Sequence, residues 1–116
     1  MLKKRKALFA MVLVVVMLTM CVLPASARTM SGTSSTGGAV MDVWYGKVSA
    51  YTYVHVSSAY LAAEAIGYDC FGAVRGSKRE ARTANSVTAV ASATAIDRGR
   101  SYHSGPSISF TFYTAV

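Results

Sequence analysis

The scarcity of large aliphatic side chains after residue 27 limits what this chain can fold into. Residues 28–116 contain one leucine and three isoleucines, but 14 alanines, seven tyrosines and 22 serines and threonines. A core built from such side chains is thin, so the layers that enclose it have to approach closely. A domain of this size also buries only about 60 to 65% of the surface that its unfolded chain exposes, which makes its stability marginal.

The first 27 residues have the features of an export signal. A basic cluster, Lys3 to Lys6, precedes an apolar run from Ala7 to Leu23. The small residues Ala25 and Ala27 then provide a signal-peptidase site, which predicts cleavage before Arg28 and a secreted, extracellular mature chain of 89 residues.

Two alternatives to a cleaved signal remain at the N-terminus. The apolar run of 17 residues is close to the lower limit for a helix that spans a bilayer, so it could serve as an uncleaved anchor. Cys21 could carry a lipid, but the residue before it is Met20 rather than a small residue. In each case the basic cluster stays on the cytoplasmic side and the rest of the chain is exported.

The charge of the mature chain is too small and too scattered for a nucleic-acid-binding surface. Residues 28–116 carry eight basic and five acidic side chains, a formal net charge of +3. Four of the bases, Arg75, Lys78, Arg79 and Arg82, fall within eight residues, in a segment whose composition indicates a turn or loop. We hypothesise that this basic loop contacts an anionic cell-wall or membrane surface.

Alternating residues predict a strand from Val43 to Ser57. One face is mainly apolar, and it contains Trp44, Val48, Ala50, Val54 and Val56. The other face is rich in tyrosine, and it contains Tyr45, Lys47, Ser49, Tyr51, Tyr53 and His55. The rings of Tyr45, Tyr51 and Tyr53 are suited to stacking on sugars or on an extracellular protein, and the alternative is burial against a second sheet.

Two further strands are predicted by the same period of two. In residues 85–94 Val87, Ala89, Ala91 and Ala93 share one face and Thr88, Val90, Ser92 and Thr94 share the other, and either face could be buried. The small side chains on both faces are expected for a strand close to another sheet. In residues 107–116 the apolar side chains Ile108, Phe110 and Phe112 point to one face. Turns are predicted between these strands at residues 97–100 and 104–106.

Residues 57–67 are ambiguous between strand and helix. Tyr60 and Ile66 share one face of a strand with Tyr68, which favours a strand among β-type neighbours. The alanine-rich sequence alone favours a short helix at about residues 58–66 that ends at Gly67.

These elements predict an all-β chain, a small antiparallel β-sandwich or open barrel over residues 40–116. The alternative is an α+β fold with the one short helix. The Gly/Ser/Thr-rich residues 28–39 are interpreted as a flexible leader without anchoring side chains.

The residues that could carry catalysis or bind a metal are few. His55 and His103 are the two imidazoles of the chain, and neither lies in a metal-ligand or catalytic motif with Cys70. We therefore expect no enzyme activity, no metal and no cofactor. Cys70 is left without Cys21 after cleavage, so a dimer linked through Cys70 is one expectation, and a buried thiol is the other.

Two functional classes follow from these observations. The first is a small, secreted, non-catalytic β protein that binds an extracellular surface, polymer or protein partner. The second is a secreted antagonist, because a short, basic, β-rich, exported chain resembles in outline the β-sandwich bacteriocins of the lactococcin type. No motif matches residue by residue, so the sequence assigns no family. A small extracellular enzyme is the third and least supported class.

Overall fold

The structure is a computed structural model that describes residues 28–55 and 57–116, and every regular element in that part of the chain is a β-strand. The strands are β1 (Arg28–Thr33), β2 (Gly37–Trp44), β3 (Lys47–Val54), β4 (Ala59–Tyr68), β5 (Val74–Ala84), β6 (Ser86–Ser92), β7 (Arg98–Gly105) and β8 (Ile108–Ala115). The all-β prediction is confirmed. The export signal and its cleavage site before Arg28 lie outside the described residues, and no helix within them is long and apolar enough to cross a membrane.

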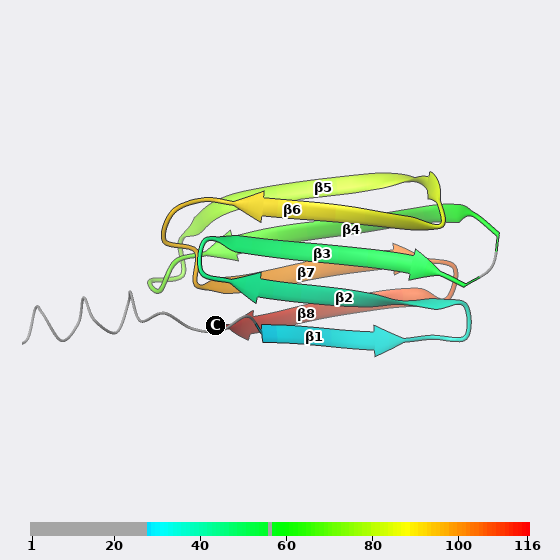
Figure 1. The fold of residues 1–116 in the computed structure, drawn as a ribbon, viewed down its shortest axis with the longest axis horizontal. Coiled ribbons are helices and arrows are strands. Elements are labelled where there is room, and N and C mark those ends of the chain that lie inside the picture. Colours follow the sequence, from blue (N-terminus) through cyan, green and yellow to red (C-terminus); the bar gives the residue numbers. More distant parts are fainter. Residues whose placement is uncertain (1–27, 56) are drawn as a thin grey trace, which may run out of the picture.

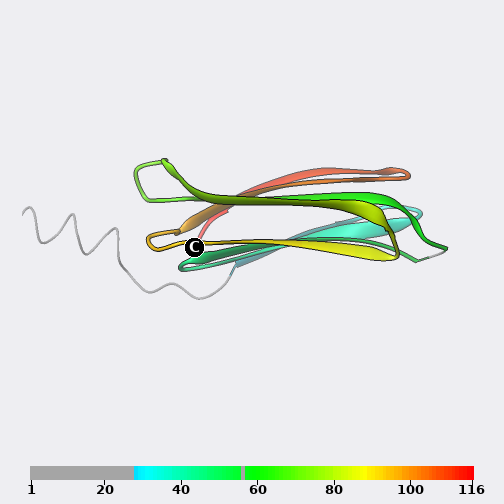
Figure 2. The same ribbon diagram turned by 90° about the horizontal axis from the view of Figure 1, so that it is seen from above.

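The strands form two antiparallel sheets of four strands each. Sheet A has the order β1-β2-β3-β6 and sheet B has the order β5-β4-β7-β8 (Figure 1). The two sheets lie one above the other (Figure 2), and the chain passes between them after β3, β5 and β6. Asn85 is the single residue between β5 and β6, so these two edge strands run side by side in different sheets.

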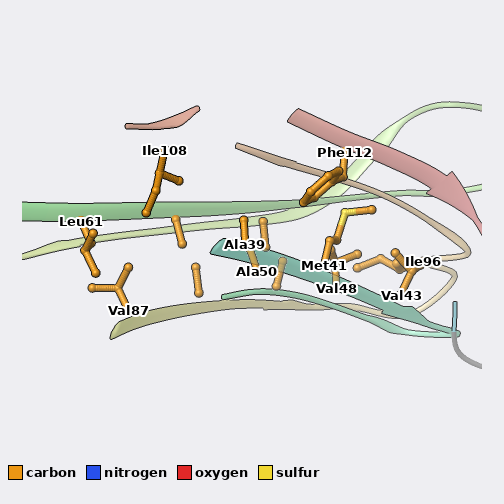
Figure 3. Packing of buried hydrophobic residues seen from close by; sticks show 14 of the residues in the cluster. Ala39, Met41, Val43, Val48, Ala50, Leu61, Val87, Ile96, Ile108 and Phe112 are labelled. Atoms are coloured by element: carbon orange, nitrogen blue, oxygen red, sulfur yellow. The ribbon is translucent and has the colours of Figure 1, made fainter. Parts of the chain in front are cut away.

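The core between the sheets is made largely of small side chains, as the composition predicts. Alternate alanines and valines on β2, β3 and β6 face the core, and larger side chains come from Met41, Leu61, Ile96 and Phe112 (Figure 3). A Cβ at Gly99 would lie 2.6 Å from Val43 Cγ2, so the backbone of β7 packs directly on sheet A there. The absence of a side chain at this position allows the close approach.

The segment that was ambiguous between helix and strand is strand β4, so the short-helix alternative is wrong. β4 pairs with β5 on one side and with β7 on the other. Its alternate residues Leu61, Ala63 and Ala65 are completely buried against sheet A. Burial on this face and pairing on both sides outweigh the helical propensity of the alanines, because that propensity is worth only tenths of a kcal/mol, ~0.7 at most, per residue.

The structure decides which face of β6 is buried, and it confirms the inward face predicted for β8. Val87, Ala89 and Ala91 of β6 are buried. Ile108 and Phe112 of β8 are buried as well, and Phe110 is half-buried.

The predicted flexible leader is instead part of sheet A. Residues 28–33 form β1, which pairs in full register with β2, and β2 itself begins at Gly37. Gly32 is needed without a side chain, because a Cβ there would lie 2.6 Å from the Phe110 ring. The small residues of this segment therefore allow close packing between the sheets instead of indicating a flexible leader.

A turn at Tyr45 and Gly46 divides the strand that was predicted from Val43 to Ser57. Gly46 has a φ of 88°, which a residue with a side chain rarely adopts. The turn makes Trp44 the partner of Lys47 on the outer face of sheet A. The prediction that Trp44 shares the buried face of Val48 is therefore wrong.

Two segments predicted as turns are strands. The basic segment forms the middle of β5, and residues 98–100 begin β7. Gly99 and Ser101 are small because they face the core, not because the chain turns there. The turn that precedes β7 lies at Thr94 and Ala95, and Ala95 has a φ of 65°.

Candidate functional site

The outer face of sheet B carries the largest gathering of aromatic and basic side chains in the described part of the chain. The register of the sheet places Arg79, Glu64, Tyr102 and Thr111 side by side across its four strands. The next outward row contains Ile66, Arg100 and Tyr113. Neighbours in such a row are close enough for their side chains to touch.

Arg100 is held between two tyrosine rings. Its guanidinium carbon lies 5.3 Å from the ring centre of Tyr113 and 5.9 Å from that of Tyr68. Its Nη1 donates a hydrogen bond of 3.5 Å to the hydroxyl of Tyr102, which raises the pKa of Arg100. The guanidinium is thus a fixed, permanently charged group on this face.

An open depression of about 420 Å³ lies on the same face, and Tyr102, the hydrogen-bond partner of Arg100, lies at its rim. Its rim includes Arg79, Glu64 and Tyr102, and hydroxyls come from Ser104, Ser109 and Thr111. Ala62 lies between these groups and is nearly buried. A cation, a carboxylate, a phenol and several hydroxyls around a small floor can hold a polar ligand by hydrogen bonds and stacking.

The four residues of the predicted basic loop do not share one surface. Arg75 donates from Nε to Asp69 at 2.9 Å, and Lys78 forms an ion pair with Glu80 at 3.4 Å. The register places Lys78 and Arg82 on the face of β5 that is turned toward sheet A, because they pair with buried Ala65 and Leu61. Of the four, Arg79 is the one at the depression.

The predicted tyrosine face lies on the outside of sheet A, so burial against the second sheet does not occur. Tyr51 and Tyr53 stack with ring centres 5.4 Å apart, and His55 meets Tyr53 edge-on at 5.4 Å. Tyr53 also covers Gly38, where a Cβ would lie 2.6 Å from its hydroxyl. Tyr45 lies apart from them in the turn after β2, and its side chain is exposed.

The buried face of β7 contains a polar network that joins the two sheets. His103 Nδ1 lies 2.8 Å from Thr52 Oγ1, and His103 Nε2 lies 2.7 Å from Ser101 Oγ. Because Thr52 donates to the carbonyl of Ala62 at 3.0 Å, it accepts from Nδ1–H, and Nε2 accepts from Ser101. Burial lowers the pKa of His103 to about 4, so the imidazole is neutral at neutral pH.

This network lies in the core between the two sheets. Ser101 and Thr52 are completely buried and His103 is 3% exposed, so a substrate could not reach the hydroxyls. His103 also lies opposite Ala63 of β4, whereas Cys70 lies in the loop beyond the end of β4 at Tyr68, five residues or about 17 Å further along the strand. His103 and Cys70 therefore do not form a catalytic pair in this arrangement.

The loop between β4 and β5 is fixed by a buried carboxylate. Asp69 accepts hydrogen bonds of 2.9 Å from the amides of Phe71 and Ala73, and its pKa is lowered, chiefly by the bond from Ala73. Cys70 in this loop is not a free thiol in the structure, and a dimer linked through it stays a prediction. Within residues 28–55 and 57–116, no three acidic, histidine or cysteine side chains gather as metal ligands.

Sequence reasoning missed Arg100, Tyr102 and Tyr68 as surface residues. The alternation of Arg98, Arg100 and Tyr102 with small residues was the available signal. Residues 97–100 are predicted as a turn instead, because glycine and charged residues are typical of turns.

No known family model matches this chain, and no curated protein and no solved structure is similar to it.

Proposed function

We propose that the chain is a small secreted β-sandwich without catalytic activity that binds an anionic extracellular polymer through the outer face of sheet B. The observation that carries this proposal is the placement of Arg79 and Tyr102 at one depression, with Arg100 and Tyr113 in the adjacent outward row of the same face. Fixed guanidinium groups pair with phosphate or carboxylate groups in a bidentate manner, and the tyrosine rings can stack on sugar units.

The basic residues that support this binding differ from those expected from the sequence. Arg75 and Lys78 are paired with acidic side chains, whereas Arg79 has Glu64 as its nearest neighbour in register and no ion pair among the described residues. The proposed site therefore keeps Arg79 from the predicted basic segment and adds Arg100 from β7.

Replacing Arg79 and Arg100 together by Gln should weaken binding of residues 28–116 to purified cell walls that carry teichoic acid. Each basic side chain near an anionic surface contributes about 1 kcal/mol, so the affinity should fall at least about tenfold. The remaining binding should depend less on salt, because fewer counterions are displaced. A sedimentation assay over a range of NaCl concentrations measures both effects.

Lys47→Gln is the matched control, because it removes one positive charge from the outer face of sheet A, where Lys47 lies over the Trp44 ring. It should bind walls like the parent. Equal binding by the double Arg variant at low salt would contradict the proposal. Retention on anionic vesicles but not on walls would show a lipid ligand instead, and growth inhibition of related bacteria would favour the antagonist class.

Export with cleavage before Arg28 is part of the same proposal. Mass spectrometry of the protein from the culture medium should give a chain that begins at Arg28, and Ala27→Phe should block processing because the peptidase site accepts small residues. Recovery of the intact N-terminus, or of a lipid on Cys21, would contradict secretion by a cleaved signal.

A further inference from the structure

Strand β6 forms an edge of sheet A whose outward backbone groups have no strand partner among the described residues. β6 pairs with β3 alone. The hydrogen bonds from Val54 N to Asn85 O and from Ala93 N to Gly46 O show which residues of β6 bond to β3. In an antiparallel pair, the backbone groups of every second residue bond to the partner strand, here from Asn85 to Ala93. The N–H and C=O groups of Ser86, Thr88 and Val90 therefore point away from β3.

The edge of β6 lacks the features that normally prevent strand addition. Its sequence from Ser86 to Ser92 contains no charged residue and no proline, and its pairing with β3 has no bulge. Thr88 and Val90 are exposed, and Val90 is 42% accessible. By contrast, the neighbouring edge strand β5 carries five charged residues and a register shift opposite Tyr68.

The charges of β5 flank this open edge. A Cβ at Gly76 would lie 3.6 Å from Ser92 O and 3.9 Å from the Ala91 side chain, so β5 runs beside β6 in the opposite direction. Lys78 and Arg82 follow Gly76 on the same face of β5, the one turned toward sheet A. They stand beside the part of β6 that contains Val90 and Ser86, with Glu80 as the single acid between them.

We propose that the edge of β6 binds an extended acidic peptide segment of a partner protein, which adds as a fifth strand to sheet A. The backbone of Ser86, Thr88 and Val90 would supply the ladder hydrogen bonds, as in other cases of strand addition. Arg82 selects an acidic segment, because it forms no ion pair among the described residues; Lys78 is paired with Glu80 at 3.4 Å, so the three side chains together carry a net charge of +1. A second copy of this chain fits less well, because pairing β6 with β6 would bring two basic β5 strands together.

The test uses a labelled peptide of alternating valine and glutamate with blocked ends, and fluorescence anisotropy as the readout. Residues 28–116 should bind it more weakly as salt rises, and should not bind the same peptide with lysine in place of glutamate. Hydrogen exchange should show the Thr88 and Val90 amides slowed by the peptide, while the Ala89 amide, which faces β3, is slow throughout. Equal binding of the lysine peptide, or no change at these two amides, would overturn the proposal.

Thr88→Pro removes an amide that makes no bond to β3, so the sheet should persist while the affinity falls about tenfold, the value of one lost hydrogen bond. Thr88→Val is the matched control that keeps the amide. Should the proline variant fail to fold, Lys78→Gln with Arg82→Gln provides an independent test, because it leaves the β6 backbone intact. Unchanged affinity of that double variant for the valine and glutamate peptide would contradict the proposed role of the β5 bases in selecting an acidic segment.

Discussion

Phe112→Ala should unfold the domain or come close to it. The Phe112 side chain is 9% exposed, and its ring lies 5.3 Å from the His103 ring and 5.7 Å from the Phe110 ring. Removing a buried phenylalanine side chain costs about 3 to 5 kcal/mol, because apolar contacts are lost and a cavity remains. A domain has only about 5 to 15 kcal/mol in total, so thermal unfolding followed by circular dichroism should show a melting temperature lower by about 12 °C or more.

Two variants of the same strand make this prediction specific. Phe110→Ala should cost less, because Phe110 is half-buried and lies over Gly32 at the edge of the core. Thr111→Ala should change the melting temperature little, since Thr111 points outward and is exposed. A Phe112→Ala protein that melts with the parent would mean that β8 does not close the core.

Lowering the pH below 6.5 should destabilise the protein through His103. Burial holds the pKa of His103 at about 4 in the folded state, against an ordinary value of 6.5. The unfolded chain takes up a proton below pH 6.5 while the folded chain does not, so stability is fully present above pH 6.5 and falls as the pH decreases toward 4. The total loss is about 3 kcal/mol, which urea unfolding between pH 7.5 and 4.5 can measure.

His103→Gln separates this effect from those of the carboxylates. The variant loses the network with Thr52 and Ser101 and is less stable at pH 7.5, but the difference from the parent should shrink as the pH falls. Asp69 has a lowered pKa and loses stability only at more acidic pH, whereas burial raises the pKa of Asp97, which acts in the opposite direction. A constant difference between parent and His103→Gln would contradict the prediction.

The strands and their buried faces could be predicted wherever apolar and polar residues alternate without interruption. Ile108 and Phe112 lie on the buried face that the period of two indicated, whereas for β6 the period indicated a strand and the structure decided that Val87, Ala89 and Ala91 face the core. The composition also indicated close layers, and the packing of Gly99 against Val43 agrees with that expectation. A face that is buried over a whole strand leaves a periodic pattern because the pleat repeats every two residues.

The site on sheet B could not be predicted from the sequence, because its residues come from four strands. Arg79 was singled out as part of a basic run, but Arg100 and Tyr113 lie 21 and 34 residues further along the chain. Only the order β5-β4-β7-β8 and its register bring them to one face.

By itself, the sequence determined the all-β class and the alternation of three strands, since side-chain period is a local property. The tertiary structure decided which glycines allow close packing and on which faces the basic side chains lie. Gly32 and Gly99 are places of close packing, which depends on what lies opposite in the other sheet. The basic residues of β5 divide between its two faces because the strand pairs with β4 instead of forming a loop, and pairing with a distant segment leaves no mark in local composition.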